Sequence, residues 1–246
     1  MNNYSVLGVK ISDVSLKQCL EAIDAAIKSN SKIQICTTNN EFIVAAQKNS
    51  KFRDAINQSH ISIADSTGVV WAVKRLFKAK ITRIPGVDLF LEICRNAPQK
   101  QQRVFLLGGS KNVALKTKKI LQRKFIGIHI VGSIDGIEIN ENIKNQELIA
   151  TINRANANII AVALGAPKQE LWIKNNIETI KGNVFIGLGG TFDYIAGTIP
   201  RAPKIMRKVG LEWLFRLFTQ PQRIRRILTA VVAFPLMVIF KSKHQY

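Results

Sequence analysis

Residues 103–110 read Arg-Val-Phe-Leu-Leu-Gly-Gly-Ser, an apolar run that ends in a turn of small residues. A run that is apolar throughout predicts a strand buried on both faces. The lysine-rich segment after the turn, which extends to about Lys124, predicts a helix. The same order recurs along the chain, and we expect further strands at residues 33–37, 61–64, 128–131, 159–164 and 184–188.

Helical segments separate these expected strands. The polar residues after the first strand can cap a helix from about Glu41 to Lys48, a second helix is expected over 69–77, and Pro167 can open a third. Alternation of buried strands and helices is typical of α/β proteins. We therefore predict a Rossmann-like, mostly parallel sheet that is covered by helices on both faces, followed by a basic helical C-terminal appendage.

Glycines and polar residues follow the expected strands at their carboxyl ends. Open parallel sheets bind ligands beyond these ends. We therefore expect the site to collect Thr37, Asn39, Asp65, Gly108, Gly109, Gly165 and Gly190.

Three of these turns have both a functional and a structural interpretation. Gly108-Gly109 can let a helix N-terminus approach a phosphate, or it can be an ordinary tight turn. Asp193, three residues after Gly190, can accept hydrogen bonds from a nucleoside, or it can stabilise the first turn of a helix. Asp65 can act as a general base or can cap the following helix. The residues alone leave these alternatives open.

The charge of the chain predicts an anionic partner. Lys and Arg number 36 against 16 Asp and Glu, which gives a net charge of +20. The tail, defined as residues 198–246, holds ten basic residues and one acid, Glu212. Its apolar run, 227–240, is too short to span a bilayer and has basic residues on both sides. It can pack in a core or lie in a membrane interface, and the flanking charges favour the interface.

The remaining composition argues for a reduced, cytosolic protein without a metal. Cys19, Cys36 and Cys94 are isolated, and we expect them to be small buried side chains. The first eleven residues lack the pattern of a signal peptide. The three histidines lie at no ligand spacing and no Asp-x-Asp motif is present, so we expect no metal and no cofactor.

Several motifs, in order, resemble the WecG/TagA/CpsF family of bacterial glycosyltransferases (family 26). The segments that carry the resemblance cover nearly the whole chain: 37–41 (Thr-Thr-Asn-Asn-Glu), 64–65 (Ala-Asp), 83–88 (Arg-Ile-Pro-Gly-Val-Asp), 165–170 (Gly-Ala-Pro-Lys-Gln-Glu), 189–193 (Gly-Gly-Thr-Phe-Asp), 201–203 (Arg-Ala-Pro) and 210–217 (Gly-Leu-Glu-Trp-Leu-Phe-Arg-Leu), with Pro221 and Arg223.

The resemblance implies an inverting, metal-independent transfer of an N-acetylmannosamine-type sugar from a UDP donor. The implied acceptor is N-acetylglucosamine (GlcNAc) on undecaprenyl diphosphate at the cytoplasmic face of the membrane. It implies that Asp65 is the base that takes the proton of the acceptor 4-hydroxyl, and that Thr37 and Asn39 lie near the reacting sugar. Residues 1–197 would be the catalytic body, and the tail would bind the membrane and close the site.

The resemblance also assigns residues to substrate binding. Arg83 and Gln169 match positions that line the site, and Asp193 matches a position near the nucleoside. Arg216, Arg223 and Arg226 match tail arginines that close over the diphosphate. One departure concerns residue 66, where the family usually has glycine after the aspartate and this chain has serine. If that glycine adopts a positive φ, Ser66 would be strained and the aim of Asp65 would change.

Other classes fit parts of the sequence. A nucleic-acid-binding protein would also be basic, but no known binding module is present, so we expect no nucleic-acid partner. A nicotinamide-dependent dehydrogenase could use similar turns, but the full dinucleotide fingerprint is missing. A non-catalytic membrane scaffold stays open if Ser66 disrupts the site. The donor sugar, including its uronic acid form, and the oligomeric state, a homo-oligomer included, also stay open.

Overall fold

A computed structural model describes residues 1–136, 146–208 and 210–242. Six parallel strands form the central sheet, in the order β4-β3-β8-β7-β5-β6. These strands are β3 (Ile33–Thr38), β4 (Ile61–Ala64), β5 (Arg103–Gly108), β6 (His129–Ile134), β7 (Ile159–Ala163) and β8 (Val184–Gly187). The predicted parallel α/β sheet is confirmed, and each strand begins and ends within a few residues of its expected position.

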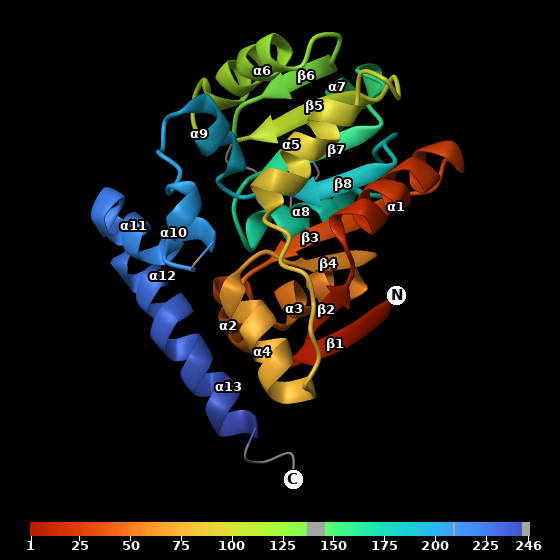
Figure 1. Cartoon of the computed structure of the whole chain (residues 1–246). Coiled ribbons are helices and arrows are strands. Elements are labelled where there is room, and N and C mark those ends of the chain that lie inside the picture. The colour runs from red at the N-terminus through yellow and green to blue at the C-terminus, as the bar shows by residue number, and fades with distance from the viewer. Residues whose placement is uncertain (137–145, 209, 243–246) are drawn as a thin grey trace.

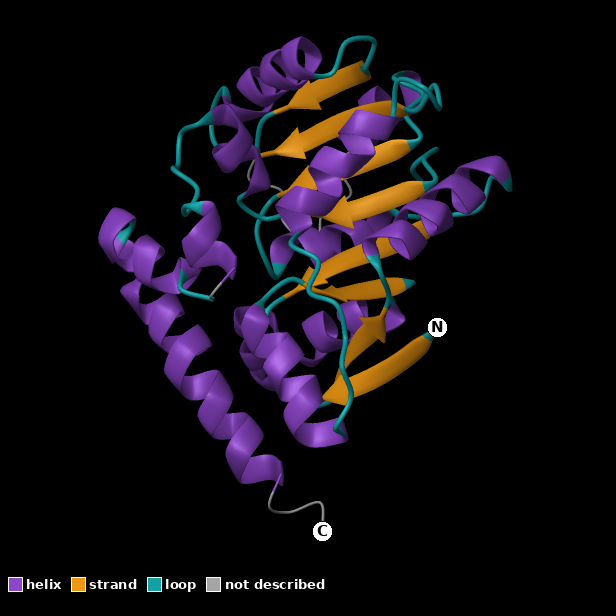
Figure 2. Ribbon diagram, viewed as in Figure 1, coloured by secondary structure: helices purple, strands orange, loops and turns teal. Residues whose placement is uncertain are grey.

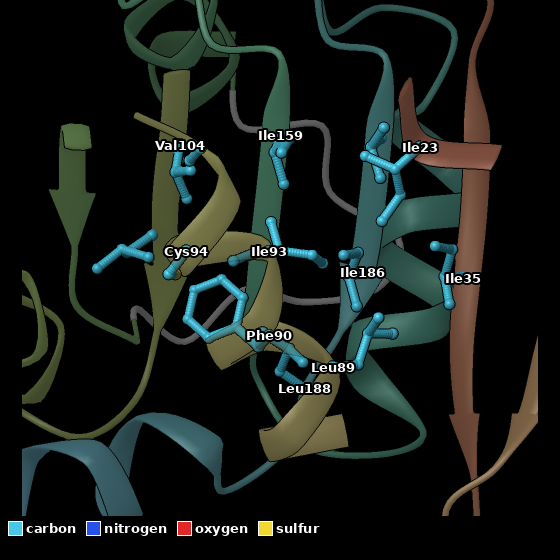
Figure 3. Close-up of a cluster of buried hydrophobic side chains, with 14 of the residues drawn as sticks. Ile23, Ile35, Leu89, Phe90, Ile93, Cys94, Val104, Ile159, Ile186 and Leu188 are labelled. Carbon is cyan, nitrogen blue, oxygen red and sulfur yellow. The ribbon is translucent and has the colours of Figure 1, made fainter. Parts of the chain in front are cut away.

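Alternate side chains of each strand enter opposite layers of the core. One layer packs the sheet against α1 (Leu16–Lys28), α5 (Gly86–Asn96), α6 (Val113–Lys124) and α9 (Thr191–Ala196). Figure 3 shows Phe90 and Ile93 of α5 in this layer, in one cluster with Val104 of β5 and Ile159 of β7. The opposite layer holds α7 (Gln146–Arg154) and α8 (Lys168–Asn176). Helices therefore cover both faces, as the apolar strands predict.

A third cluster of buried residues lies below β3 and β4, where α2 (Asn40–Lys48), α3 (Ser50–Gln58) and α4 (Thr67–Phe77) pack on an N-terminal hairpin. The hairpin consists of β1 (Asn2–Val6) and β2 (Val9–Asp13). Leu7 and Gly8 form its two-residue turn, and their φ angles of 52° and 80° are typical of a tight hairpin turn. All three cysteines are buried, as expected.

The tail contains α10 (Lys204–Lys208), α11 (Glu212–Thr219), α12 (Ile224–Leu228) and α13 (Phe234–Ser242). A 3₁₀ turn (Pro221–Arg223) precedes α12, and a π-helical turn (Thr229–Ala233) joins α12 to α13. Together, α12, the π-helical turn and α13 form one long tail helix (residues 224–242). This helix runs down one side of the molecule past α2 and α4 (Figure 1). Phe234 and Val238 are buried in the third cluster, whereas Leu236 and Phe240 are exposed.

The strand arrows of the sheet point toward the side of the molecule on which the tail lies (Figure 2). The carboxyl ends of the strands, where ligands bind in this fold, therefore face the tail. Within the described residues, no helix combines the length and the apolar character that crossing a bilayer requires.

Candidate active site

A cavity of about 240 Å³ lies between the carboxyl ends of the central strands and the tail. Nine of the expected site residues line it: Thr37, Asn39, Asp65, Arg83, Gly165, Gly190, Arg216, Arg223 and Arg226. The cavity thus joins residues from the first quarter of the chain to residues of the tail. Five arginines and three carboxylates line it, so its charge suits an anion.

Asp65 follows β4 directly and lines the cavity. Its Oδ1 accepts a hydrogen bond from the backbone N–H of Gly86, the first residue of α5, at 2.6 Å. Burial raises the pKa of Asp65 from an ordinary value of 3.8 to about 6, although the Gly86 hydrogen bond and the charge of Arg216 oppose the rise. Such a carboxyl is largely ionised at neutral pH and is a better base than an exposed aspartate.

Ser66, rather than Asp65, caps the helix that follows. The Ser66 hydroxyl accepts a hydrogen bond from the backbone N–H of Val69 at 3.4 Å. The φ of Ser66 is −113°, which is ordinary extended backbone. The serine at this position is therefore unstrained, and the local backbone holds Asp65 at the cavity without a glycine.

Thr37 and Asn39 lie where β3 passes into α2. The Thr37 hydroxyl donates to the carbonyl of Gly187 at 2.7 Å, and this hydrogen bond links β3 to β8. The Asn39 side chain caps α2 by accepting from the N–H of Phe42 at 3.1 Å. Both residues line the cavity through groups that also fix the local backbone.

Glu212 joins the body to the tail at the cavity wall. Its two carboxylate oxygens pair with Arg83, at 3.3 Å, and with Arg216, at 2.6 Å. Burial raises the pKa of Glu212, but the charges of Arg216 and Arg83 outweigh it, so the pKa lies below its ordinary value. Arg83 also donates to the backbone carbonyls of Asp65 and Arg207. The network fixes both arginines beside Asp65.

Arg223 and Arg226 reach the cavity from the turn before α12 and from α12 itself. The helix breaks at Pro221, and this bend, rather than one continuous helix face, brings them to the cavity that Arg216 also lines. Arg226 pairs with Glu41 at 2.7 Å. Arg223 forms no ion pair with a carboxylate of the described residues. Burial and the neighbouring charge of Arg226 lower its pKa, which makes an anionic ligand favourable there.

The other expected residues lie outside the cavity lining. Gly108 is the last residue of β5 and Gly109 follows it. Because β7 lies between β5 and β8 in the sheet, this turn is displaced from the cavity. Gln169 is fully buried, and its Oε1 accepts from the N–H of Gly189 at 2.9 Å, so it acts on the cavity through the glycine turn. The Asp193 side chain accepts from the Thr198 hydroxyl within the first turn of α9.

Several residues of the cavity were not singled out from the sequence. Asn40, Glu212, Tyr194 and Trp213 all line it. The Arg216 guanidinium lies over the Tyr194 ring, 5.5 Å from its centroid. Glu212 is the one acid in a strongly basic tail. A single carboxylate among so many basic residues predicts pairing with arginines, and this was the signal in the sequence that could have identified it. In the part of the chain that the structure describes, no three His, Cys, Asp or Glu residues gather as metal ligands would.

A family model described as "Glycosyl transferase WecG/TagA/CpsF family" matches residues 4–246. The chain belongs to this family. It is therefore a glycosyltransferase, and the match extends over both the α/β body and the tail. A half-buried carboxylate beside a group of arginines fits a glycosyl-transfer site.

Proposed function

We propose that this WecG/TagA/CpsF glycosyltransferase moves an N-acetylmannosamine-type sugar from a UDP donor to GlcNAc linked to undecaprenyl diphosphate. The reaction inverts the anomeric centre, needs no metal and serves the synthesis of bacterial cell-surface polysaccharide or teichoic acid. The observation that carries the proposal is that Asp65, a carboxyl with a raised pKa, lines the same cavity as Arg223, a cation without a carboxylate partner among the described residues.

In the proposed step, the 4-hydroxyl oxygen of the acceptor attacks the anomeric carbon of the donor sugar from the face opposite UDP. The new glycosidic bond forms as the bond to the diphosphate oxygen breaks, and UDP leaves with the electron pair. Asp65 takes the hydroxyl proton. Because Gly86 occupies Oδ1 of Asp65, we assign Oδ2 to this role.

The arginines neutralise the charge that develops on the leaving UDP. Arg223 is the first candidate because it lines the cavity and forms no ion pair with a carboxylate of the described residues, although the charge of Glu41 acts on it from farther away. Arg216 and Arg226 contribute from positions that Glu212 and Glu41 fix. Charge-assisted hydrogen bonds from guanidinium to phosphate are strong and directional, so they can replace a divalent cation in this role.

The tail also offers a surface for the membrane that carries the acceptor. Ile224, Leu228, Val232, Leu236 and Phe240 recur every four residues, and each is between 47% and 61% exposed. Arg225 and Arg226 are exposed beside them. An apolar stripe with basic neighbours lies well in the interface of an anionic bilayer, where each basic residue contributes ~1 kcal/mol. We therefore place the enzyme at the inner face of the cell membrane as a peripheral protein.

A transfer assay tests the proposal. The purified chain is incubated with a short-chain lipid-diphosphate-GlcNAc and a panel of UDP-sugars, and the product disaccharide and released UDP are measured together. We expect product with the N-acetylmannosamine donor. Product with only the uronic acid donor would correct the sugar. UDP-sugars that neither bind nor react would overturn the proposal.

A further inference from the structure

The long tail helix contains a backbone carbonyl that its own helix cannot satisfy. In the π-helical turn Thr229–Ala233, the N–H of Phe234 donates to the carbonyl of Thr229. The next bond of this pattern would join the nitrogen of Pro235 to the carbonyl of Ala230. Proline has no N–H, so the carbonyl of Ala230 needs a donor from outside the helix.

Asn40, at the start of α2, provides that donor. Its Nδ2 donates to the Ala230 carbonyl at 2.7 Å, across 190 residues of sequence. Its Oδ1 accepts from the hydroxyl of Ser66 at 2.7 Å, which fixes the direction of the amide. Gly68 leaves room for this arrangement, since a Cβ there would lie 2.3 Å from the Asn40 amide nitrogen. Three segments of the body and tail therefore meet at one side chain.

The contact lies at the cavity wall. Asn40 and Ala230 both line the cavity, as does Arg226, which lies one helical turn before Ala230 and pairs with Glu41. Adjacent residues of α2 thus hold the tail through its backbone and through its charge. Arg223 ends the 3₁₀ turn before α12, the short helix that leads to the anchored carbonyl.

We propose that Asn40 is a positioning residue: its amide holds the carbonyl that Pro235 leaves unpaired and so sets the place of Arg223 and Arg226 over the cavity. The role in substrate binding rests on the proposed function, whereas the anchoring of the tail does not. Asn40 touches no reacting atom in this account, so its loss should change binding of the diphosphate and leave the pKa of Asp65 in place.

Hydrogen exchange and UDP binding test this role separately. In Asn40→Ala, backbone amides of residues 226–233 should exchange roughly tenfold faster, as loss of one such hydrogen bond predicts. UDP should bind roughly fivefold more weakly for the same reason. The acidic limb of the pH–rate profile should not move. Asn153→Ala is the matched control, because the Asn153 amide also donates to a carbonyl, that of Thr179, and accepts from a backbone N–H, that of Lys181.

Pro235→Ala decides whether the unpaired carbonyl is the reason. The new N–H of residue 235 can donate to the carbonyl of Ala230. Adding Asn40→Ala to Pro235→Ala should therefore reduce protection of residues 226–233 from hydrogen exchange by less than half of what Asn40→Ala removes in the wild-type chain. Unchanged exchange of residues 226–233 in Asn40→Ala, or an equal loss in both backgrounds, would overturn the proposal. If the wild-type chain binds no UDP, the proposed function fails, and the exchange data still decide the role of Asn40.

Discussion

Replacing Asp65 with asparagine should stabilise the protein while it removes activity. The carboxyl lies at the cavity with its pKa raised by burial to about 6. In the unfolded chain its ordinary value is 3.8. Between these two values the folded state binds a proton that the unfolded state does not, so this group makes stability fall as the pH rises from about 4 to 6.

The size of the effect follows from that rise. At pH 7.5 the ionised carboxylate is about 3 kcal/mol less favourable in the folded state than in the unfolded state, since one pKa unit corresponds to about 1.4 kcal/mol. Asparagine keeps an oxygen for the Gly86 N–H but carries no charge. We expect a gain of about 2–3 kcal/mol, which for a chain of this size raises Tm by roughly 5–10 °C.

Calorimetry of both proteins between pH 4 and 8 measures this difference. The Tm advantage of Asp65→Asn should be complete above pH 6 and disappear toward pH 4, while turnover falls roughly 10²–10⁴-fold. Asp54→Asn, at an exposed position of α3, is the control and should change neither quantity. A variant less stable than wild type at pH 7.5, or turnover within a few-fold of wild type, would refute the reasoning.

Three further outcomes follow from the site and the tail. Transfer activity should survive excess EDTA, and loss that Mg²⁺ or Mn²⁺ restores would reveal a metal site. Glu212→Gln should lower the free energy of unfolding by about 2 kcal/mol at neutral pH, because it leaves two arginines without their partner. In denaturant unfolding, this deficit should shrink in acid, because the wild-type Glu212 carboxylate is protonated once the pH falls below its lowered pKa. The double variant Leu228→Glu, Leu236→Glu should weaken binding to anionic vesicles at least tenfold in a sedimentation assay. It removes roughly the free energy that two half-exposed leucine side chains gain when the bilayer buries them. The exposed Leu115→Glu on α6 should leave vesicle binding unchanged.

The sequence predicts the sheet well because each central strand is an apolar run bounded by a polar or glycine turn. The hairpin β1–β2 was missed because its strands are mixed in polarity and its turn carries Leu7, a residue that gives no turn signal. The tail run 227–240 was expected to favour a membrane interface. The structure buries Phe234 and Val238 and exposes Leu236 between them, a division that the packing on α2 and α4 sets.

The sequence predicts those site residues whose position depends on a neighbouring strand, and misses those whose position depends on contacts between distant segments. Thr37 lies at the end of β3 and Asp65 follows the neighbouring β4, so the sheet alone brings them together. Gly108 and Gly109 also follow a strand, but their distance from the cavity depends on the order of strands in space, which the pattern does not contain. The contact between Asn40 and Ala230 joins residues 190 apart, and no local rule predicts it.

Turnover on a water-soluble acceptor in Arg223→Ala tests most directly the claim that the tail is part of the active site. Arg225→Ala is the matched control, since Arg225 is exposed and lies outside the cavity lining. We predict that Arg223→Ala lowers turnover roughly 10²-fold, the cost of losing one preorganised group that stabilises developing charge. Binding to anionic vesicles should stay within about fivefold of wild type, because one basic residue near a membrane surface contributes ~1 kcal/mol. Arg225→Ala should leave turnover unchanged. Wild-type turnover of the soluble acceptor by Arg223→Ala, with vesicle binding reduced, would contradict the account and reduce this part of the tail to a membrane anchor.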